Sequence, residues 1–254
     1  MSDKALPEHA RVVVIGGGII GCSVAYHLAE MGCDEVVLLE RDQLTSGTTW
    51  HAAGLMTTYG SGSETLLGIR RHSMELYKRI EEETGQQTGF KGVGFIELAA
   101  DEDRLEEYRR ITAFNRLHGT EIHELSPAEV KDLFPYAETD NICAGFYAEH
   151  DGRINPVDVT MALARGARMK GAKIFQNTPV RGVLTRNGTV TGVRTDEGEI
   201  RAEFVVNCAG MWARQLGEQN GVVIPNQAAE HYLSLIHISE PTRQVLVSRM
   251  PSSA

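Results

Sequence analysis

A glycine-rich loop between a short apolar run and a helical pattern is the feature that most restricts how this chain can fold. Residues Arg11–Ile15 form a mostly β-branched run, which is typical of a parallel strand buried on both faces. The loop Gly16–Gly21 follows with the spacing G-x-G-x-x-G, and apolar residues then recur at helical spacing over Ile19–Met31. A second buried strand is expected over Glu35–Leu39. This order predicts a βαβ unit with a parallel sheet and a right-handed crossover.

Each glycine of the loop has a place in a dinucleotide-binding turn. Gly16 permits the tight turn, Gly18 lets the backbone approach a pyrophosphate, and Gly21 lets the helix lie close to the strand. Glu40 follows the second strand, where its carboxylate can accept hydrogen bonds from ribose hydroxyls and disfavours the 2′-phosphate of NADP. We therefore predict a dinucleotide site and not a chance glycine turn. The loop alone leaves NAD and FAD as alternatives.

The rest of the chain alternates helical and strand patterns, which indicates an α/β architecture. Helices are expected at Glu64–Thr84, at Asp101–His118 with Asp101 as N-cap, from Ser126 to before Pro135, and from Asn155 to about Lys170; strands are expected at Phe90–Ala99 and between Lys173 and Cys208, with turns at Asn187–Gly188 and Asp196–Gly198.

Composition argues against several classes of partner. A net charge of −9 does not provide the basic surface that nucleic-acid phosphates require. No apolar run reaches the ~20 residues that span a bilayer, and Met1–Ala10 has neither a signal-peptide nor a transit-peptide pattern. The 4 cysteines form no C-x-x-C pair, so we expect buried, reduced thiols and no metal site. The predicted protein is cytoplasmic and binds neither nucleic acid nor membrane.

The segment that follows the second strand identifies a family. Residues Glu40–Gly54 resemble the flavin-binding segment of the D-amino-acid-oxidase-like FAD-dependent oxidoreductases, within them the dimethylglycine and sarcosine dehydrogenase branch. Glu82–Gly85, Asp151–Pro156 and Val205–Ala213 are similar to further segments of the same branch, in the same order. The resemblance covers most of the chain up to Tyr232 and implies FAD as the cofactor.

The resemblance also implies a fold: an α/β protein with a Rossmann-type FAD-binding domain built on a parallel sheet, plus an incomplete α+β substrate domain. The implied domains are 1–90 and 151–215 for the two parts of the FAD-binding domain, 91–150 for a substrate-domain segment, 216–232 for the start of a second such segment, and 233–254 for a non-native tail.

Small and hydroxylated residues after Glu40 suit a flavin. Ser46 and Gly47 let the backbone close over a flat ring, while Thr48 and Thr49 offer hydroxyls and amides to phosphate and ribitol oxygens. In similar proteins the histidine at the position of His51 is bonded to the 8α carbon of the flavin, so the resemblance implies covalent FAD here. A neutral imidazole is a competent nucleophile near pH 7. The alternative is a histidine hydrogen-bonded beside a non-covalent flavin.

Further site residues follow from the family and from strand ends. Val180 is implied to meet the adenine through its backbone, with a plain core valine as the alternative. Ala209 and Gly210 follow a strand at its carboxyl end, where an α/β sheet receives its ligand. Trp212 is either a neighbour of that site or a core aromatic residue. His231 is implied to lie near the substrate amine.

The implied reaction is oxidation of an N-methyl amino acid of the dimethylglycine or sarcosine type. A hydride passes from the carbon next to nitrogen to flavin N5, and water hydrolyses the iminium to amine and formaldehyde. The substrate nitrogen must first lose its proton to gain a lone pair, and His231 is the catalytic candidate for that step. Alternatives are another amino-acid oxidase or a polyol-phosphate dehydrogenase of this group, or an inactive nucleotide-binding fragment. The electron acceptor stays open among oxygen, a flavoprotein and a quinone.

The residues after Tyr232 are expected to differ in origin from the rest of the chain. Leu233–Arg243 matches, residue for residue, the translation of a transposon adapter widely used in preparing DNA for sequencing. The alternative interpretation of Leu233–Arg243 is a strand that ends at a turn containing Pro241. We expect instead that residues after Tyr232 are not native sequence and that the chain is an N-terminal fragment.

Overall fold

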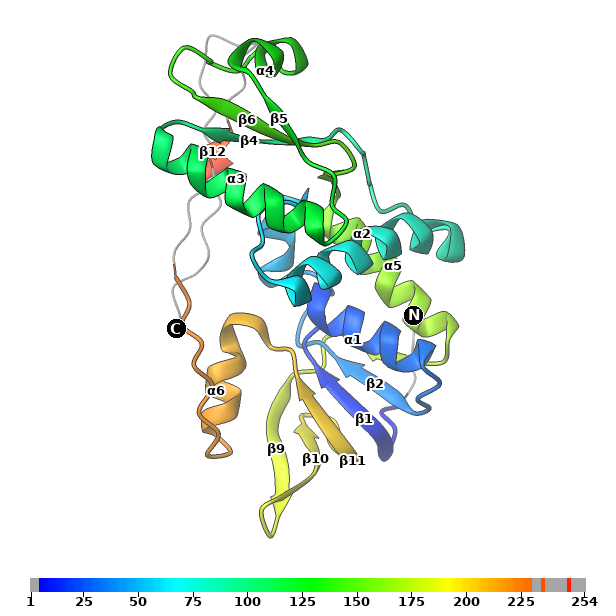
Figure 1. Ribbon diagram of the computed structural model, residues 1–254. Coiled ribbons are helices and arrows are strands. Elements are labelled where there is room, and N and C mark those ends of the chain that lie inside the picture. Colours follow the sequence, from blue (N-terminus) through cyan, green and yellow to red (C-terminus); the bar gives the residue numbers. More distant parts are fainter. Residues whose placement is uncertain (1–4, 230–233, 236–245, 248–254) are drawn as a thin grey trace. The chain divides into compact units, whose positions relative to one another are not determined.

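The computed structural model describes residues 5–229, 234–235 and 246–247 (Figure 1). The chain divides into two compact units. The first unit contains the residues up to Ala53, Glu83–Gln86 and the residues from Pro156 onward, and the second contains Gly54–Glu82 and Gln87–Asn155. No helix in the described ranges is long and apolar enough to cross a membrane.

The first unit is built on a six-stranded mixed sheet. The strand order is β8 (Lys173–Phe175), β2 (Val36–Leu39), β1 (His9–Ile15), β11 (Gly198–Asn207), β10 (Thr189–Thr195) and β9 (Val180–Arg186). The first four run parallel, and β10 and β9 are antiparallel to their neighbours. The helices of this unit are α1 (Ile19–Glu30), α5 (Pro156–Met169) and α6 (Ala213–Glu218), with 3-10 turns η1 (Thr49–His51) and η2 (Gly210–Trp212).

The predicted βαβ unit is confirmed. In Figure 1, α1 runs alongside β1 and β2, and β1 pairs in parallel with β2 in a register that sets Ile15 opposite Leu39. Every residue of β2 is buried, as expected of a parallel strand covered on both faces. Helix α1 ends where predicted, because Gly32 adopts a φ of +81°, a left-handed conformation that stops a helix.

The sheet is not purely parallel, and the hairpin is the reason. Asn187 and Gly188 both have positive φ values, 52° and 77°, as a two-residue hairpin turn requires. So short a connection can join only antiparallel strands. β10 therefore runs antiparallel to both β11 and β9, and β9 runs in the direction of the parallel strands. The turn predicted at this place is confirmed.

The second unit is a smaller α+β unit. It contains β3 (Leu55–Met56), all but the last residues of α2 (Glu64–Thr84), β4 (Phe95–Ala99), α3 (Glu102–Leu117), β5 (His123–Leu125), α4 (Pro127–Leu133), β6 (Ala144–Ala148) and β7 (Gly152–Arg153). Strands β4, β6 and β5 form an antiparallel sheet, and β3 pairs with β7. Phe146 is fully buried and stacks on Tyr59 with 6.3 Å between ring centroids.

The capping signals of the second unit are confirmed. The Asp101 side chain accepts a hydrogen bond from the Arg104 backbone N–H at 2.8 Å and so begins α3. Ser126 and Glu129 form a reciprocal capping box at the start of α4. The strand expected from Phe90 begins only at Phe95, because the backbone first turns through Gly94, which has a φ of +76°.

The compact units divide after Ala53 and after Asn155, and Glu83–Gln86 belongs to the first unit. The predicted boundaries of the functional domains, at 90 and 150, stay predictions. The assignment of the units as FAD-binding and substrate domains stays a prediction. In the tail, Ser234–Leu235 pairs with Leu246–Val247, and the rest of the expected non-native segment lies outside the described residues.

Asp151 is a buried carboxylate that joins distant segments of the second unit. Its exposed fraction is 0%. It accepts hydrogen bonds from the Thr58 backbone N–H at 2.9 Å, from the Thr58 hydroxyl at 2.6 Å and from the Tyr59 N–H at 3.4 Å. Its backbone carbonyl accepts from the Gly94 N–H at 2.8 Å. Several neutral donors thus satisfy the oxygens of the buried side chain and fix the segment after β3.

We expect Asp151→Ala to lower the free energy of unfolding by about 3 kcal/mol, because the buried donors of Thr58 and Tyr59 would lose their acceptor. Asp151→Asn keeps one carbonyl oxygen and should cost about half as much. Denaturant titration followed by circular dichroism measures both. The exposed Glu149→Ala is the matched control and should change stability by less than about 0.5 kcal/mol. An Asp151→Ala protein as stable as this control would contradict the assignment.

Candidate functional site

Three stretches of backbone approach one another at the glycine loop. Gly16 has a φ of +110°, and a Cβ placed on it would lie 2.3 Å from the Cys208 carbonyl oxygen. A Cβ on Gly21 would lie 1.9 Å from the Gly16 carbonyl oxygen. No side chain fits at either place, so the tight turn and the close helix packing predicted for these glycines are present.

The crowding is one-sided. A Cβ on Gly17 would meet the Leu44 side chain at 2.6 Å and the Glu40 side chain at 2.8 Å. A Cβ on Gly18 would meet only the Thr49 hydroxyl oxygen, at 3.0 Å. The open side of the loop is therefore at Gly18, the N-cap of α1, where backbone N–H groups and the helix dipole favour a negative charge.

Glu40 is held against the glycine loop. Its carboxylate accepts a hydrogen bond from the Gly17 backbone N–H at 2.5 Å and another from the Asp42 N–H at 3.0 Å. Its backbone bonds to Phe175 and Thr178 on the neighbouring segment. The two β1–β2 strand ends thus bring the loop and the acid to the same edge of the sheet, as predicted.

The segment after Glu40 folds back onto the loop. The Thr45 N–H donates to the Gly17 carbonyl at 3.0 Å, and the Thr49 hydroxyl accepts from the Ile19 N–H at 3.0 Å. The predicted hydroxyl of Thr49 is therefore at the helix N-terminus, whereas Ser46 and Thr48 are exposed. The segment that carries His51 is anchored on both sides of its middle.

His51 is partly buried, and its ring is fixed by a backbone carbonyl. Nδ1 lies 3.2 Å from the Gly47 carbonyl oxygen. Because a carbonyl only accepts, Nδ1 carries the hydrogen, and in the neutral ring Nε2 keeps its lone pair. The Trp50 ring lies beside the imidazole, with 3.8 Å between centroids. The geometry leaves Nε2 as the nucleophilic nitrogen.

The remaining predicted residues lie in different surroundings. Ala209 and Gly210 follow β11, and the Ala209 Cα would lie 3.3 Å from a Cβ on Gly16, so they join the loop at the sheet edge. Val180 begins β9 and packs against the core of the first unit. Its backbone contact with adenine stays a prediction. His231 lies outside the described residues.

Sequence reasoning missed two features of the site. Gly17 packs against the Glu40 side chain, although it is not part of the G-x-G-x-x-G spacing. The available signal was the second glycine of the run Gly16–Gly18. Arg41 lies over the Trp212 ring, 3.9 Å from its centroid, and no local pattern connects these two residues.

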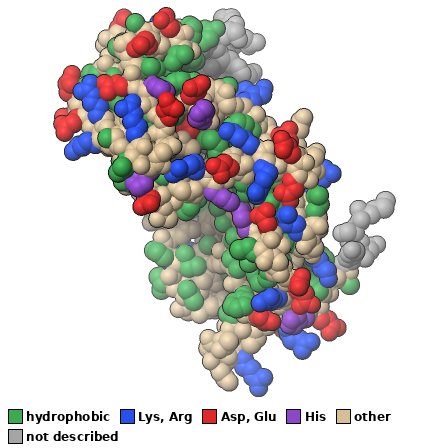
Figure 2. Space-filling model, turned by 45° about the vertical axis from the view of Figure 1, so that its right-hand side comes forward, with side chains coloured by type: hydrophobic (Ala, Val, Ile, Leu, Met, Phe, Trp, Pro, Cys, Tyr) green, Lys and Arg blue, Asp and Glu red, His purple; other side chains and the backbone are tan. Residues whose placement is uncertain are grey.

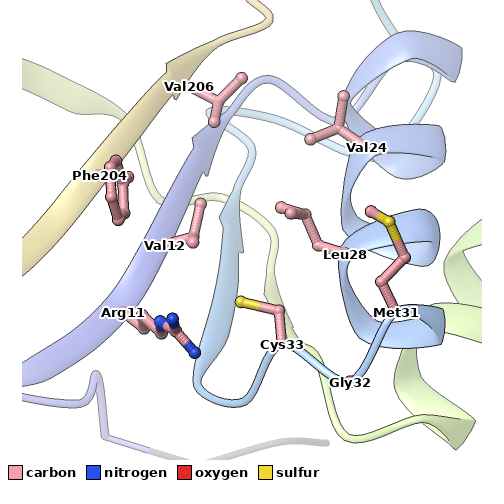
Figure 3. A pocket seen from close by; sticks show the side chains of 9 residues that line it. All are labelled: Arg11, Val12, Val24, Leu28, Met31, Gly32, Cys33, Phe204 and Val206. Carbon is pink, nitrogen blue, oxygen red and sulfur yellow. The ribbon is translucent and has the colours of Figure 1, made fainter.

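An apolar groove of about 490 Å³ in the first unit is separate from this site (Figure 3). Side chains of α1, β1 and β11 line it, among them Leu28, Val12 and Phe204. It contains none of the predicted site residues, and Arg11 is its one charged side chain.

Figure 2 shows acidic and basic side chains interspersed on the visible face. Within the described residues, no group of three or more His, Cys, Asp or Glu side chains could hold a metal ion.

The comparisons with known proteins agree with this site. The family described as FAD dependent oxidoreductase (DAO) matches residues 11–253. The chain belongs to this family of FAD-dependent oxidoreductases, which confirms the family resemblance and the α/β fold. It is 42% identical over 234 residues to mitochondrial sarcosine dehydrogenase of Homo sapiens, covering 90% of this chain and 25% of that protein.

Two further proteins are similar. Mitochondrial dimethylglycine dehydrogenase of Rattus norvegicus is 43% identical over 224 residues, which cover 88% of this chain and 26% of that protein. The crystal structure of L-proline dehydrogenase from P. horikoshii superimposes with a TM-score of 0.80 at 30% identity, covering 89% of this chain and 59% of that one. The chain thus spans about a quarter of the length of the two dehydrogenases it matches in sequence.

We expect Glu40→Gln to weaken FAD binding by about 1.5 to 3 kcal/mol, because an amide offers one acceptor oxygen where the carboxylate offers two, and no charge. Titration of the apoprotein with FAD, followed by flavin fluorescence, measures the loss. Glu35→Gln, at the other end of β2, is the control and should leave binding unchanged. Equal affinities of the two variants would mean that the cofactor does not use this edge.

The reactivity of the Cys22 thiol should measure how tightly the glycine loop packs against α1. Burial raises the pKa of the Cys22 thiol to about 12, and its sulfur lies 3.7 Å from the Gly17 carbonyl. Only Cys22 is fully buried, contrary to the expectation for all four cysteines; Cys33, Cys143 and Cys208 are half-buried. At pH 8 we expect a disulfide reagent to modify Cys22 at least about a hundredfold more slowly than Cys33, since only the thiolate reacts. Rapid labelling of Cys22 in folded Cys33→Ser protein would contradict this closed loop.

Proposed function

We propose that the chain is the FAD-binding part of an enzyme that oxidises N-methyl amino acids of the sarcosine or dimethylglycine type. The observation that carries the proposal is the position of His51, on a segment hydrogen-bonded to the dinucleotide loop. The substrate class is supported by the names of the two dehydrogenases that match nine-tenths of this chain.

The residues present fit FAD. The open N-terminus at Gly18 would receive the pyrophosphate, Glu40 the adenosine ribose, and Ala209 with Gly210 the backbone side of the flavin. When bound, FAD supplies a two-electron acceptor for the hydride of the substrate carbon next to nitrogen. The protein's part is to hold this acceptor at the carboxyl edge of the sheet. The electron acceptor that follows FAD stays open.

We propose further that FAD is covalently bonded through Nε2 of His51. The Gly47 carbonyl holds the ring in the tautomer whose lone pair is on Nε2, and that lone pair is what attack on the 8α methyl carbon requires. Overall, one N–H bond of the imidazole and one C–H bond of the methyl group are replaced by an N–C bond. Dioxygen, the oxidant, takes up the two hydrogens as hydrogen peroxide.

His231 is proposed to assist deprotonation of the substrate amine, which must have a free lone pair before its neighbouring carbon can give up a hydride. An amino-acid oxidase or a polyol-phosphate dehydrogenase of the same family is the alternative. A fragment that binds nucleotide without turnover is the second. Oxidation of N-methylglycines by a full-length form separates the proposal from both.

We expect full-length protein, precipitated with acid and washed, to stay yellow and fluorescent, because the flavin is bonded to His51. His51→Ala should release all its FAD to the supernatant while still binding FAD when folded. Formaldehyde released from sarcosine and dimethylglycine is measured in the same preparations. His27→Ala, on α1, is the control and should keep its bound flavin. A colourless wild-type precipitate would contradict the proposed covalent bond but not the proposed FAD site.

A further inference from the structure

We propose that Trp212 and Arg41 are a positioning pair that fixes the segment carrying His51 for attachment of the flavin. The inference rests on the proposed covalent bond and concerns residues that no local pattern connects. Trp212 is the last residue of η2, which follows β11 after Cys208 and Ala209, and Arg41 directly follows Glu40. All residues of the argument belong to the first unit.

The indole of Trp212 has contacts with two parts of one segment. The guanidinium carbon of Arg41 lies 3.9 Å from the centroid of the Trp212 ring, a cation–π geometry. A Cβ built on Gly47 would lie 3.5 Å from Cζ3 of the Trp212 ring, at van der Waals distance, so the indole edge faces the Cα of Gly47 with room for no more than a methyl group between them. Trp212 therefore lies against the segment between Arg41 and Gly47.

The contact at Gly47 matters because Gly47 also holds the nucleophile. Its carbonyl oxygen is the acceptor for His51 Nδ1 at 3.2 Å. Displacement of this carbonyl would free the ring to rotate or to take the other tautomer, which places the hydrogen on Nε2. Arg41 lies over Trp212, Trp212 lies beside Gly47, and the Gly47 carbonyl holds the His51 ring. Through these contacts, Arg41 influences which nitrogen of His51 carries the lone pair.

Other contacts hold the segment on either side of Gly47. Hydrogen bonds fix it at Leu44, whose N–H donates to the Gln176 side chain at 2.8 Å, at Thr45, whose N–H donates to the Gly17 carbonyl, and at Thr49 on the helix N-terminus. Between them, Ser46 and Thr48 are exposed. The charged neighbour of Arg41 is Asp42, whose carboxylate lies 3.5 Å from the guanidinium and helps to orient it. Charge and ring together hold the Gly47 backbone.

The test follows flavin attachment in time. Full-length apoprotein is mixed with FAD, and two quantities are measured: the initial FAD affinity, from flavin fluorescence, and the rate at which flavin becomes acid-precipitable with the protein. We expect Trp212→Leu and Arg41→Gln to attach flavin about tenfold more slowly, since misplacement of a reacting group slows the step. Their thermal stability should equal that of wild type, and their initial FAD affinity should lie within about threefold of the wild-type value.

Conservative variants and a neighbouring cation provide the controls. Trp212→Phe and Arg41→Lys keep a ring and a charge and should restore part of the rate. Arg214→Gln removes an exposed cation from α6, paired with Glu218, and should attach flavin at the wild-type rate.

The outcomes separate the two proposals. Wild-type rates in both Trp212→Leu and Arg41→Gln would overturn the positioning pair alone. Losses of rate that only follow losses of stability or of FAD affinity would overturn it also. If wild-type protein takes up no covalent flavin, the covalent bond proposed for His51 fails, and this inference fails with it.

Discussion

The close approach of backbone at Gly16, Gly21 and Cys208 is the constraint on which the rest of the first unit depends. A Cβ on Gly16 or on Gly21 would lie closer to the neighbouring carbonyl oxygen than any side chain allows, so β1, α1 and the end of β11 can meet this closely only with glycine at both positions. That meeting point sets where α1 begins and therefore where its free N–H groups face. An anion site at this edge is thus a consequence of packing, and Glu40 completes it from the neighbouring strand.

The segment that carries His51 inherits its position from the same loop. The Thr45 N–H and the Thr49 hydroxyl both bond to backbone groups next to Gly18, so a shift of the loop would shift the imidazole. Cofactor binding and cofactor attachment are in this sense one structural problem. A substitution at Gly16 or Gly21 should impair both, whereas one at Trp212 should impair attachment more than binding.

Local signals in the sequence were enough for the elements and for the glycine loop. Helix α2 begins and ends at the predicted residues, and the caps Asp101 and Ser126 have the predicted bonds. Contacts between residues far apart in sequence were not predictable, because no spacing announces them. Asp151 with Thr58 fixes the segment after β3, and Arg41 lies over the ring of Trp212 beside the segment that carries His51. The position of His231 near a substrate stays a prediction.

The candidate cofactor site lies within the first unit. The glycine loop, Glu40 and the segment that folds back onto the loop all belong to this unit. The site for the dinucleotide can therefore be tested without any knowledge of the substrate. Substrate choice is another matter, because the matched dehydrogenases are about four times as long as the part that this chain covers. An unchanged cofactor site with altered substrate preference is therefore physically possible within this family. The covalent bond proposed for His51 therefore rests on this chain's own geometry, whereas the proposed substrate class rests on the names of similar proteins.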